Sequence, residues 1–272
     1  FMFSPDNIDF AESKKNILSI RLMPNGFYFS IHCLTDGTVF YQNSVSFSPI
    51  EDYLECIEKL IFDYPFFSDN YKKIYVICVD DATTIVPNDY YDKRWAAELL
   101  SFNCLNHKSH IISNELQEHD CRVIWGIDKS IHSFLSRALL NPNFVSHLSF
   151  LVPLFYKLHN KNKDALFVNF NDNKMLDIVA FSADKLTLAK TFHTSNLLEE
   201  SYYIQKTWES LQLNVQLDKL FFSGNTSNHS ECIDNLKRVV SNTDIISWNV
   251  PEGAKINNEE IPTEILKQLC EL

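Results

Sequence analysis

Two stretches of the chain, residues 17–79 and 164–224, carry the same order of apolar and polar positions. Each stretch opens with three apolar or alternating runs that are separated by short polar turns. A segment with apolar residues three and four positions apart follows, and a continuous apolar run closes the stretch. Alternation at period two predicts strands, whereas spacing at three and four predicts a helix. The pattern therefore predicts a β-β-β-α-β unit that occurs twice.

The first copy is predicted to hold four strands and one helix. The strands are expected at residues 17–22, 27–34, 38–47 and 74–79, and the helix at residues 50–64. Pro24-Asn25-Gly26 and Asp36-Gly37 separate the first three strands, and such pairs ending in Gly are strong signals for hairpin turns. The last strand is a continuous apolar run, which is typical of a strand covered on both faces.

The second copy repeats this order. Its strands are expected at residues 165–170, 175–182, 185–193 and 217–222, and its helix at residues 197–213. The turn at Asn171-Asp172-Asn173 follows the turn at Pro24 by 147 residues, and the turn at Ala183-Asp184 follows that at Asp36 by the same offset. A shared offset of matching turns favours an internal duplication.

The other segments complete the division of the chain. We expect a lead-in at residues 1–16, a first lobe at 17–150 with an insertion at 84–140, and a second lobe at 151–272. The insertion is predicted to hold an extended piece that ends at Val86-Pro87, a helix at 90–102, strands around 110–112 and 121–127, and a helix that Asp128 caps and that ends at Leu140.

Three elements are expected after the second copy, namely a helix at 228–240, a strand at 244–250 and a helix at 262–272. The last of these helices is apolar on one side. Two interpretations are open for it, because such a helix either docks on its own lobe or is presented to a partner.

The composition limits the kinds of site, partner and cellular location to be expected. The 272 residues include 21 Phe but only five Gly, which argues against a site made of glycine-rich loops. The formal net charge of −11 makes nucleic acid a poor partner. Seven Cys are scattered without a C-x-x-C motif, which is typical of a reducing cytoplasm. No apolar run approaches the ~18 residues of a membrane helix, so we expect a cytoplasmic protein without a membrane span.

Three patterns raise other possibilities for chemistry or binding. His107-Lys108-Ser109-His110 and His119-Asp120-Cys121 contain ligand types that zinc prefers, but their spacing matches no strong zinc pattern, and polar strand ends are the simpler interpretation. Ser223-Gly224 follows a strand but lacks the G-x-S-x-G motif of a nucleophile elbow. Aromatic clusters at 64–67 and 89–95 fit either the core or a seam between the lobes, or else a partner surface.

The predicted order of elements resembles a known fold. Three meandering strands, a crossover helix and a parallel fourth strand make the ribonuclease-H-like unit, and two such units with an insertion between them resemble the actin-like ATPase superfamily. The resemblance implies an α/β fold with two ribonuclease-H-like lobes, whose mixed β-sheets are flanked by helices, in an actin-like arrangement with an inserted subdomain. More narrowly, the strand sequences and Phe221-Phe222-Ser223-Gly224 are similar to an uncharacterised Bacteroidetes family, domain-of-unknown-function family 3822.

The resemblance implies a nucleotide cleft between the lobes and the residues that would line it. The first phosphate loop falls on Arg21 and the turn at Asn25-Gly26, and the second falls on Asn169 and the turn at Asn171-Asp172. The adenosine motif falls on Ser223-Gly224-Asn225. The candidate cleft therefore comprises Arg21, Asn25, Gly26, Asn169, Asn171, Asp172, Ser223, Gly224 and Asn225.

All three of these elements depart from the superfamily pattern. Arg21 and Asn169 stand where the superfamily has Asp, and Asn171 stands where it has Gly. Mg²⁺ that bridges ATP phosphates needs carboxylates and open backbone. A two-metal nuclease is disfavoured on the same ground, because Asp80 and Asp81 follow the fourth strand but Arg21 replaces the carboxylate of the first strand.

These observations predict a non-catalytic actin-like protein, a pseudo-ATPase, that binds or scaffolds another protein. No cofactor and no metal are expected. The alternative is a nucleotide-binding switch or weak ATPase, which would hold ATP and Mg²⁺ at a non-standard site between the lobes. A structural homo-oligomer is a third class of function.

Overall fold

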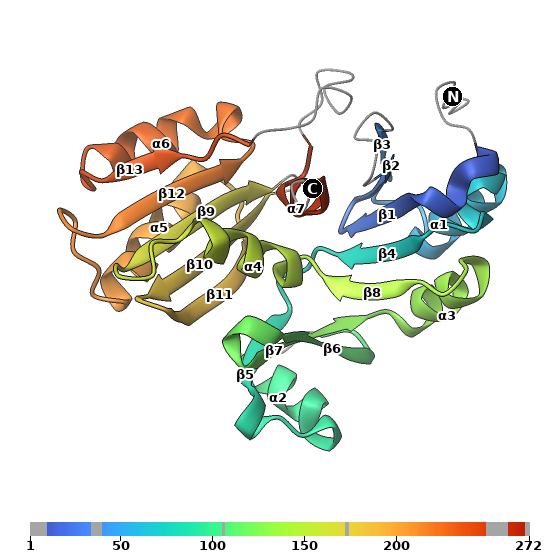
Figure 1. Cartoon of the computed structure of the whole chain (residues 1–272), viewed down its shortest axis with the longest axis horizontal. Coiled ribbons are helices and arrows are strands. Elements are labelled where there is room, and N and C mark those ends of the chain that lie inside the picture. Colours follow the sequence, from blue (N-terminus) through green and yellow to red (C-terminus); the bar gives the residue numbers. More distant parts are fainter. Residues whose placement is uncertain (1–9, 34–39, 105–106, 172–173, 249–260, 270–272) are drawn as a thin grey trace.

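The computed structural model describes residues 10–33, 40–104, 107–171, 174–248 and 261–269. Within these ranges the chain forms two lobes, each built on a five-stranded sheet, and a smaller three-stranded sheet that projects from the first lobe (Figure 1). Helices flank both large sheets, and each sheet contains parallel and antiparallel pairs. This architecture confirms the α/β fold with two lobes that the sequence predicts.

The sheet of the first lobe has the strand order β3-β2-β1-β4-β8. Its strands and helices are β1 (Asn16–Met23), β2 (Gly26–Cys33), β3 (Phe40–Ser46), α1 (Tyr53–Asp63), β4 (Lys73–Cys78), α3 (Lys129–Ala138) and β8 (Asn143–Ser146). Leu18 and Ile20 of β1 point to the face that α1 and α3 cover, and they share one core with Ile57 and Ile61 of α1. The two-residue period of the strand and the helical spacing of α1 bring these side chains together.

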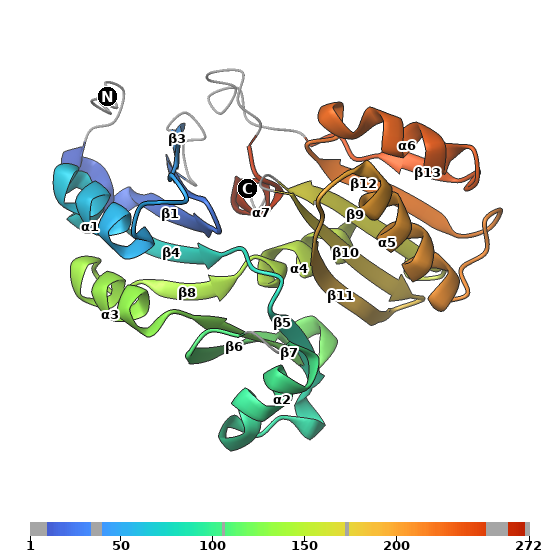
Figure 2. The same cartoon turned by 180° about the vertical axis from the view of Figure 1, so that it is seen from behind.

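The sheet of the second lobe has the matching order β11-β10-β9-β12-β13. Its strands and helices are β9 (Ala165–Asn171), β10 (Met175–Ser182), β11 (Lys185–His193), α5 (Leu197–Ser210), β12 (Lys219–Gly224), α6 (Ser230–Lys237) and β13 (Thr243–Ile245). Figure 2 shows α5 lying across this sheet. Leu166 and Val168 of β9 are buried with Ile204 of α5 and Ile233 of α6. The equal strand order of the two lobes confirms the predicted duplication.

The insertion forms a sheet of its own with the order β5-β7-β6, and one helix covers it. These elements are β5 (Thr83–Pro87), α2 (Ala96–Asn103), β6 (His110–Leu116) and β7 (Cys121–Ile127). Asp128 then caps α3, because its side chain accepts hydrogen bonds from the backbone N–H groups of Ser130 and Ile131. The predicted helix start at Asp128 is therefore confirmed.

Several predicted boundaries differ from the structure. The first long helix starts at Tyr53 instead of residue 50, because the Asp52 side chain accepts a bond from the backbone N–H of Glu55 and caps the helix there. The helix predicted at 90–102 starts at Ala96, since Asp92 fixes a short 3-10 turn by accepting from the backbone N–H of Arg94. The last strand ends at Ile245, and the predicted turn at residues 36 and 37 lies outside the described residues.

Two further helices lie where the lobes meet, and they are α4 (Leu148–Leu158) and α7 (Thr263–Leu269). Phe155 of α4 stacks on Phe167 of β9 at a ring-centroid distance of 5.0 Å. Both views show α7 between the two large sheets (Figures 1 and 2). Because α4 crosses the predicted boundary at residues 150 and 151, the exact division into domains stays a prediction. Among the helices in the described ranges, none has the length and apolar composition of a membrane span.

Candidate functional site

The residues predicted to line the cleft lie where the first strands of the two lobes meet. Arg21 lies near the end of β1, and Asn169 and Asn171 lie at the end of β9, the equivalent strand of the second lobe. Ser223 lies on β12, directly beside Asn169 in the parallel pairing of the two strands. All four side chains are buried. The duplicated strand order thus brings together residues that are about 150–200 positions apart in the sequence.

Arg21 is bound by residues from elsewhere in the chain. Its Nε forms a buried ion pair with Oε1 of Glu264, which belongs to α7, and its Nη2 donates to Oδ1 of Asn171 at 2.8 Å. The exposed fractions of Arg21 and Glu264 are 1% and 0%. A charge this deeply buried is stable only when a partner of opposite charge and further hydrogen bonds accompany it. The Glu264 carboxylate is therefore the counter-ion of Arg21.

Asn169 uses both ends of its side-chain amide within the protein. Its Oδ1 accepts from the Thr263 hydroxyl of α7 at 2.6 Å and from the Ser223 hydroxyl at 2.9 Å. Its Nδ2 donates to Oδ2 of Asp177 at 2.9 Å, and Asn171 donates to the same carboxylate oxygen. The predicted phosphate positions are consequently filled by an internal network of hydrogen bonds.

Asp177 and His147 complete this network, and the sequence analysis did not single out either residue. Nε2 of His147 lies 2.9 Å from Oδ1 of Asp177, and Nδ1 lies 3.1 Å from the carbonyl oxygen of Cys78. Two acceptors on one ring require both ring nitrogens to carry protons, which is the charged form of histidine. The sequence signal for Asp177 was a single carboxylate inside the apolar strand β10.

The protonation of this pair follows from its surroundings. Burial acts to lower the pKa of His147, but the Asp177 carboxylate and its hydrogen bond outweigh burial and raise that pKa above its ordinary value. Burial likewise acts to raise the pKa of Asp177, but the positive His147 and the donors Asn169 and Thr191 lower it. The two groups therefore form a buried ion pair.

The helix α7 bonds to both lobes at once. Glu264 and Gln268 reach the first lobe, where Gln268 accepts from the Ser19 hydroxyl at 2.8 Å, and Thr263 reaches Asn169 of the second lobe. Ile265 and Leu266 are buried in an apolar cluster that contains residues of both lobes. The C-terminal helix therefore docks within the protein, but it contacts both lobes instead of its own lobe alone.

The other predicted cleft residues do not join the network. Asn25 is exposed at the tip of the turn between β1 and β2, and Gly26 begins β2. Gly224 has a φ of +75°, and a Cβ there would lie 2.2 Å from the carbonyl oxygen of Phe170, so the position requires glycine. The backbone N–H of Asn225 donates to the same carbonyl at 2.9 Å. Asp172 lies outside the described residues.

The candidate zinc ligands are not brought together. His107 bonds to Ser101, His110 stacks on His132 with centroids 4.0 Å apart, and His119 packs on Tyr156. In the ranges that the structure covers, no group of three or more His, Cys, Asp or Glu side chains could hold a metal ion. The histidines of the insertion therefore take part in hydrogen bonds and ring contacts within the protein.

The two aromatic clusters have different surroundings. Phe66 and Phe67 are buried in the core of the first lobe, so the cluster at 64–67 belongs to the core. Tyr90 and Trp95 of the insertion have exposed fractions of 78% and 57%. A partner surface therefore stays open as an interpretation for the second cluster alone.

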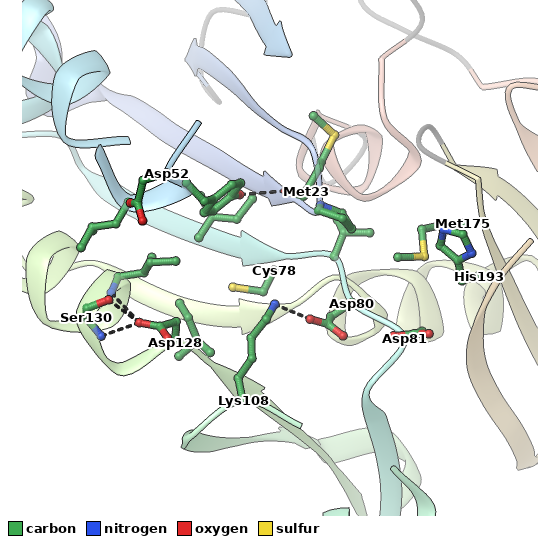
Figure 3. A pocket seen from close by; sticks show the side chains of 17 residues that line it. Met23, Asp52, Cys78, Asp80, Asp81, Lys108, Asp128, Ser130, Met175 and His193 are labelled. Atoms are coloured by element: carbon green, nitrogen blue, oxygen red, sulfur yellow. Dashed lines mark hydrogen bonds and ion pairs between the residues drawn. The ribbon is translucent and has the colours of Figure 1, made fainter. Parts of the chain in front are cut away.

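A cavity of about 600 Å³ lies beside the network, between the first lobe, the insertion and the second lobe (Figure 3). It is lined by Leu22, Met23, Pro24, Asp52, Tyr53, Leu54, Cys78, Val79, Asp80, Asp81, Lys108, Ile127, Asp128, Ser130, Ile131, Met175 and His193. The strands β1 and β4 end at this cavity, and crevices at the carboxyl ends of strands are common ligand sites in α/β proteins. Of the eight candidate cleft residues that the structure describes, none lines it.

Solved structures with the same fold place the chain in context. A protein from Bacteroides thetaiotaomicron VPI-5482 with an actin-like ATPase fold and unknown function is 23% identical, with a TM-score of 0.83 over 97% of this chain and 98% of that chain. A structure of the PilM–PilN type IV pilus biogenesis complex is 13% identical, with a TM-score of 0.53 over 94% of both chains. These similarities show the actin-like fold.

Sequence comparison gives the family. None of the curated proteins is a significant match to the chain. The family model described as "Protein of unknown function (DUF3822)" matches residues 5–243, which is most of the chain. This match confirms the resemblance stated from the strand sequences. The chain belongs to the DUF3822 family.

Proposed function

We propose that this protein is a non-catalytic, actin-like module that binds or scaffolds another protein. One observation carries the proposal: the Arg21–Glu264 ion pair puts a carboxylate of the chain itself beside the position where a phosphate contact is expected. Thr263 of the same helix bonds to Asn169 at the second expected phosphate position. A nucleotide at these positions would have to displace α7 from both lobes.

The hydrogen bonds of the network also argue against ATP hydrolysis. Hydrolysis of ATP by this fold needs Mg²⁺, and Mg²⁺ needs carboxylate oxygens that are free to bind it or its water ligands. The Asp177 carboxylate at the expected site accepts hydrogen bonds from Asn169, Asn171 and Thr191 and pairs with His147. Its oxygens are therefore engaged within the protein.

A role in protein binding is supported by the likeness to one solved complex. The PilM–PilN structure has the same fold and is a complex of two proteins in type IV pilus biogenesis. We extend only the class of function to this chain, because a shared fold does not specify a partner. A cytoplasmic location stays an expectation from the cysteine pattern.

Thermal unfolding with and without nucleotide tests the proposal against the nucleotide-switch alternative. The full chain would be melted with Mg²⁺ and, in turn, millimolar ATP, ADP and GTP. A ligand at 100 times its Kd adds about 2.7 kcal/mol to the free energy of unfolding, which a melting curve resolves. We expect no rise in Tm with any of the three, and a clear rise would support the switch and overturn the proposal.

Capture of a partner provides the second arm of the test. The tagged full chain would be used to retain proteins from native lysate at several salt concentrations. Protein binding predicts that at least one protein is retained in a stoichiometric amount. A result at background level under all conditions, together with a monomer in size-exclusion chromatography, would contradict both scaffolding and homo-oligomer formation.

A further inference from the structure

The cavity between the first lobe and the insertion has two acidic edges. Asp52 and Asp128 lie on one side of it, and Asp80 and Asp81 lie on the other side (Figure 3). Lys108 is the one lysine or arginine among the lining residues that the structure describes, and it forms an ion pair with Asp80. Four carboxylates and one lysine give the cavity an excess of negative charge.

Three of these carboxylates form no ion pair with a described lysine or arginine, although Lys108 lies near enough to Asp128 to help lower its pKa. Asp52 and Asp128 accept backbone N–H groups at the starts of α1 and α3, which orients both side chains without neutralising their charge. The hydrogen bonds from Ser130 hold the pKa of Asp128 below its usual value, so this carboxylate is charged at neutral pH. Asp81 is exposed at the opposite edge, where it forms no ion pair with a described side chain.

Apolar side chains make up much of the lining between the acidic edges, although Lys108 also reaches into this space (Figure 3). Side chains of Leu22, Val79 and Ile127 come from the ends of β1, β4 and β7, and Met175 of the second lobe joins them. Ligand sites in proteins are typically cavities of about 300–1,000 Å³ with an apolar lining and a few polar groups, and the observed volume falls within this range. The cavity can therefore hold apolar side chains together with positive charges.

The same features exclude other classes of ligand. Phosphates and nucleic acid carry negative charge, which the four carboxylates repel. A metal ion needs several ligands converging on one point, and the described residues contain no such group. Cys78 lies in the cavity, but burial raises the pKa of its thiol to about 12, so it is no nucleophile near neutral pH.

We propose that this cavity binds an extended segment of a partner protein in which an apolar residue is flanked by Lys or Arg. The apolar side chain contacts Leu22, Val79 and Ile127, and the basic side chains reach Asp52 and Asp128 at one edge and Asp81 at the other. This inference rests on the proposed function, and it assigns the partner site to the cavity instead of the phosphate positions that α7 covers.

A random dodecapeptide display library, selected on the immobilised full chain, tests the assignment. Three proteins would be compared: the wild type, Asp81→Lys, and the control Asp234→Lys, which makes the same charge change at an exposed position of α6. We expect the wild type and the control to select peptides with basic residues flanking an apolar one. Asp81→Lys should lose this selection while its melting curve stays that of a folded protein.

A selected peptide then gives the quantitative result. Its Kd, measured by fluorescence anisotropy, should rise about tenfold or more in Asp81→Lys, stay unchanged in Asp234→Lys, and rise with salt because the contacts are charged. Failure to select basic peptides, or equal selection by all three proteins, overturns the assignment. Lysate capture distinguishes failure of this assignment from failure of the proposed function. A partner retained equally by the wild type and Asp81→Lys would support the proposed function and contradict the assignment to the cavity. Peptide binding without any retained partner would contradict only the proposed function.

Discussion

Nη2 of Arg21 lies 2.8 Å from Oδ1 of Asn171, although the two residues are 150 positions apart in the chain. Arg21 lies near the end of the first strand of one lobe, and Asn171 ends the first strand of the other. The contact joins equivalent strands of a duplicated unit across the junction, and Glu264 of α7 neutralises the charge that it buries.

Glu264→Gln should destabilise the protein strongly. The substitution leaves the Arg21 guanidinium buried without a counter-ion, and removal of one partner of a buried pair costs about 3–5 kcal/mol of the free energy of unfolding. Chemical denaturation would measure the loss. Glu231→Gln on the exposed side of α6 is the matched control and should change stability by no more than about 0.5 kcal/mol. Equal effects in the two variants would contradict the role assigned to Glu264.

The double variant Arg21→Met with Glu264→Leu should regain most of this stability. Replacement of both members of a buried ion pair by apolar residues of similar size is often neutral or stabilising, because no charge remains to be buried. Denaturation midpoints of the double and single variants would be compared. A double variant that is less stable than Glu264→Gln would show that the hydrogen bond from Arg21 to Asn171 matters more than the charge.

Asn169→Asp would restore the carboxylate of the superfamily pattern, and we expect it to lower stability without producing ATP hydrolysis. Asn169 donates a hydrogen bond to Asp177, and the substitution removes this donor and places two carboxylates side by side in a buried site. A loss of about 2–4 kcal/mol is expected. Asn160→Asp, at an exposed position, is the control. Phosphate release in the variant at a rate above that of the wild type would contradict this expectation.

The contribution of the His147–Asp177 pair to stability should be largest at mildly acidic pH. The folded-state pKa of His147 is raised, so its contribution is complete below the ordinary value of 6.5 and is lost as pH rises through the raised pKa. The pKa of Asp177 is lowered, so its contribution is complete above 3.8 and is lost as pH falls through the lowered pKa. His147→Gln should flatten the alkaline limb of Tm against pH, whereas the exposed His193→Gln should not.

His32 predicts a separate loss of stability in acid. This residue is fully buried, its ring nitrogens have no hydrogen-bond partner among the described residues, and burial lowers its pKa to about 4. Between pH 6.5 and 4 the unfolded chain binds a proton that the folded protein does not, so stability falls as pH falls. The loss over this window is about 3 kcal/mol. His32→Leu should remove this part of the acid limb, and an unchanged limb would contradict the assignment.

The strands and turns could be predicted from the sequence because their signals are local. The pair Asn25-Gly26 marks a hairpin turn wherever it stands, and a capping Asp such as Asp128 acts on the next three residues. The helix predicted at 90–102 begins only at Ala96 for an equally local reason, because the hydrogen bond from the backbone N–H of Arg94 to Asp92 fixes a short 3-10 turn before it. Such local competition is hard to judge from apolar spacing alone.

The junction could not be predicted in this way. Arg21 and Glu264 are separated by 243 residues, and His147 and Asp177 are single polar residues within apolar stretches. No periodicity links such residues, and only the folded topology brings them together. The resemblance to the superfamily drew attention to Arg21 and Asn169 between the lobes, but it carried no information about α7.

The mutual dependence of the junction residues has a consequence for how this family diverges. Most of the polar groups there bond to one another, so a single replacement leaves an unpaired donor, acceptor or charge in a buried site. Mutations at one member should therefore be tolerated only after a second change, and drift at the junction should proceed in linked steps. In related sequences Arg21 and Glu264 should be exchanged together, while exposed positions such as Asn25 vary independently.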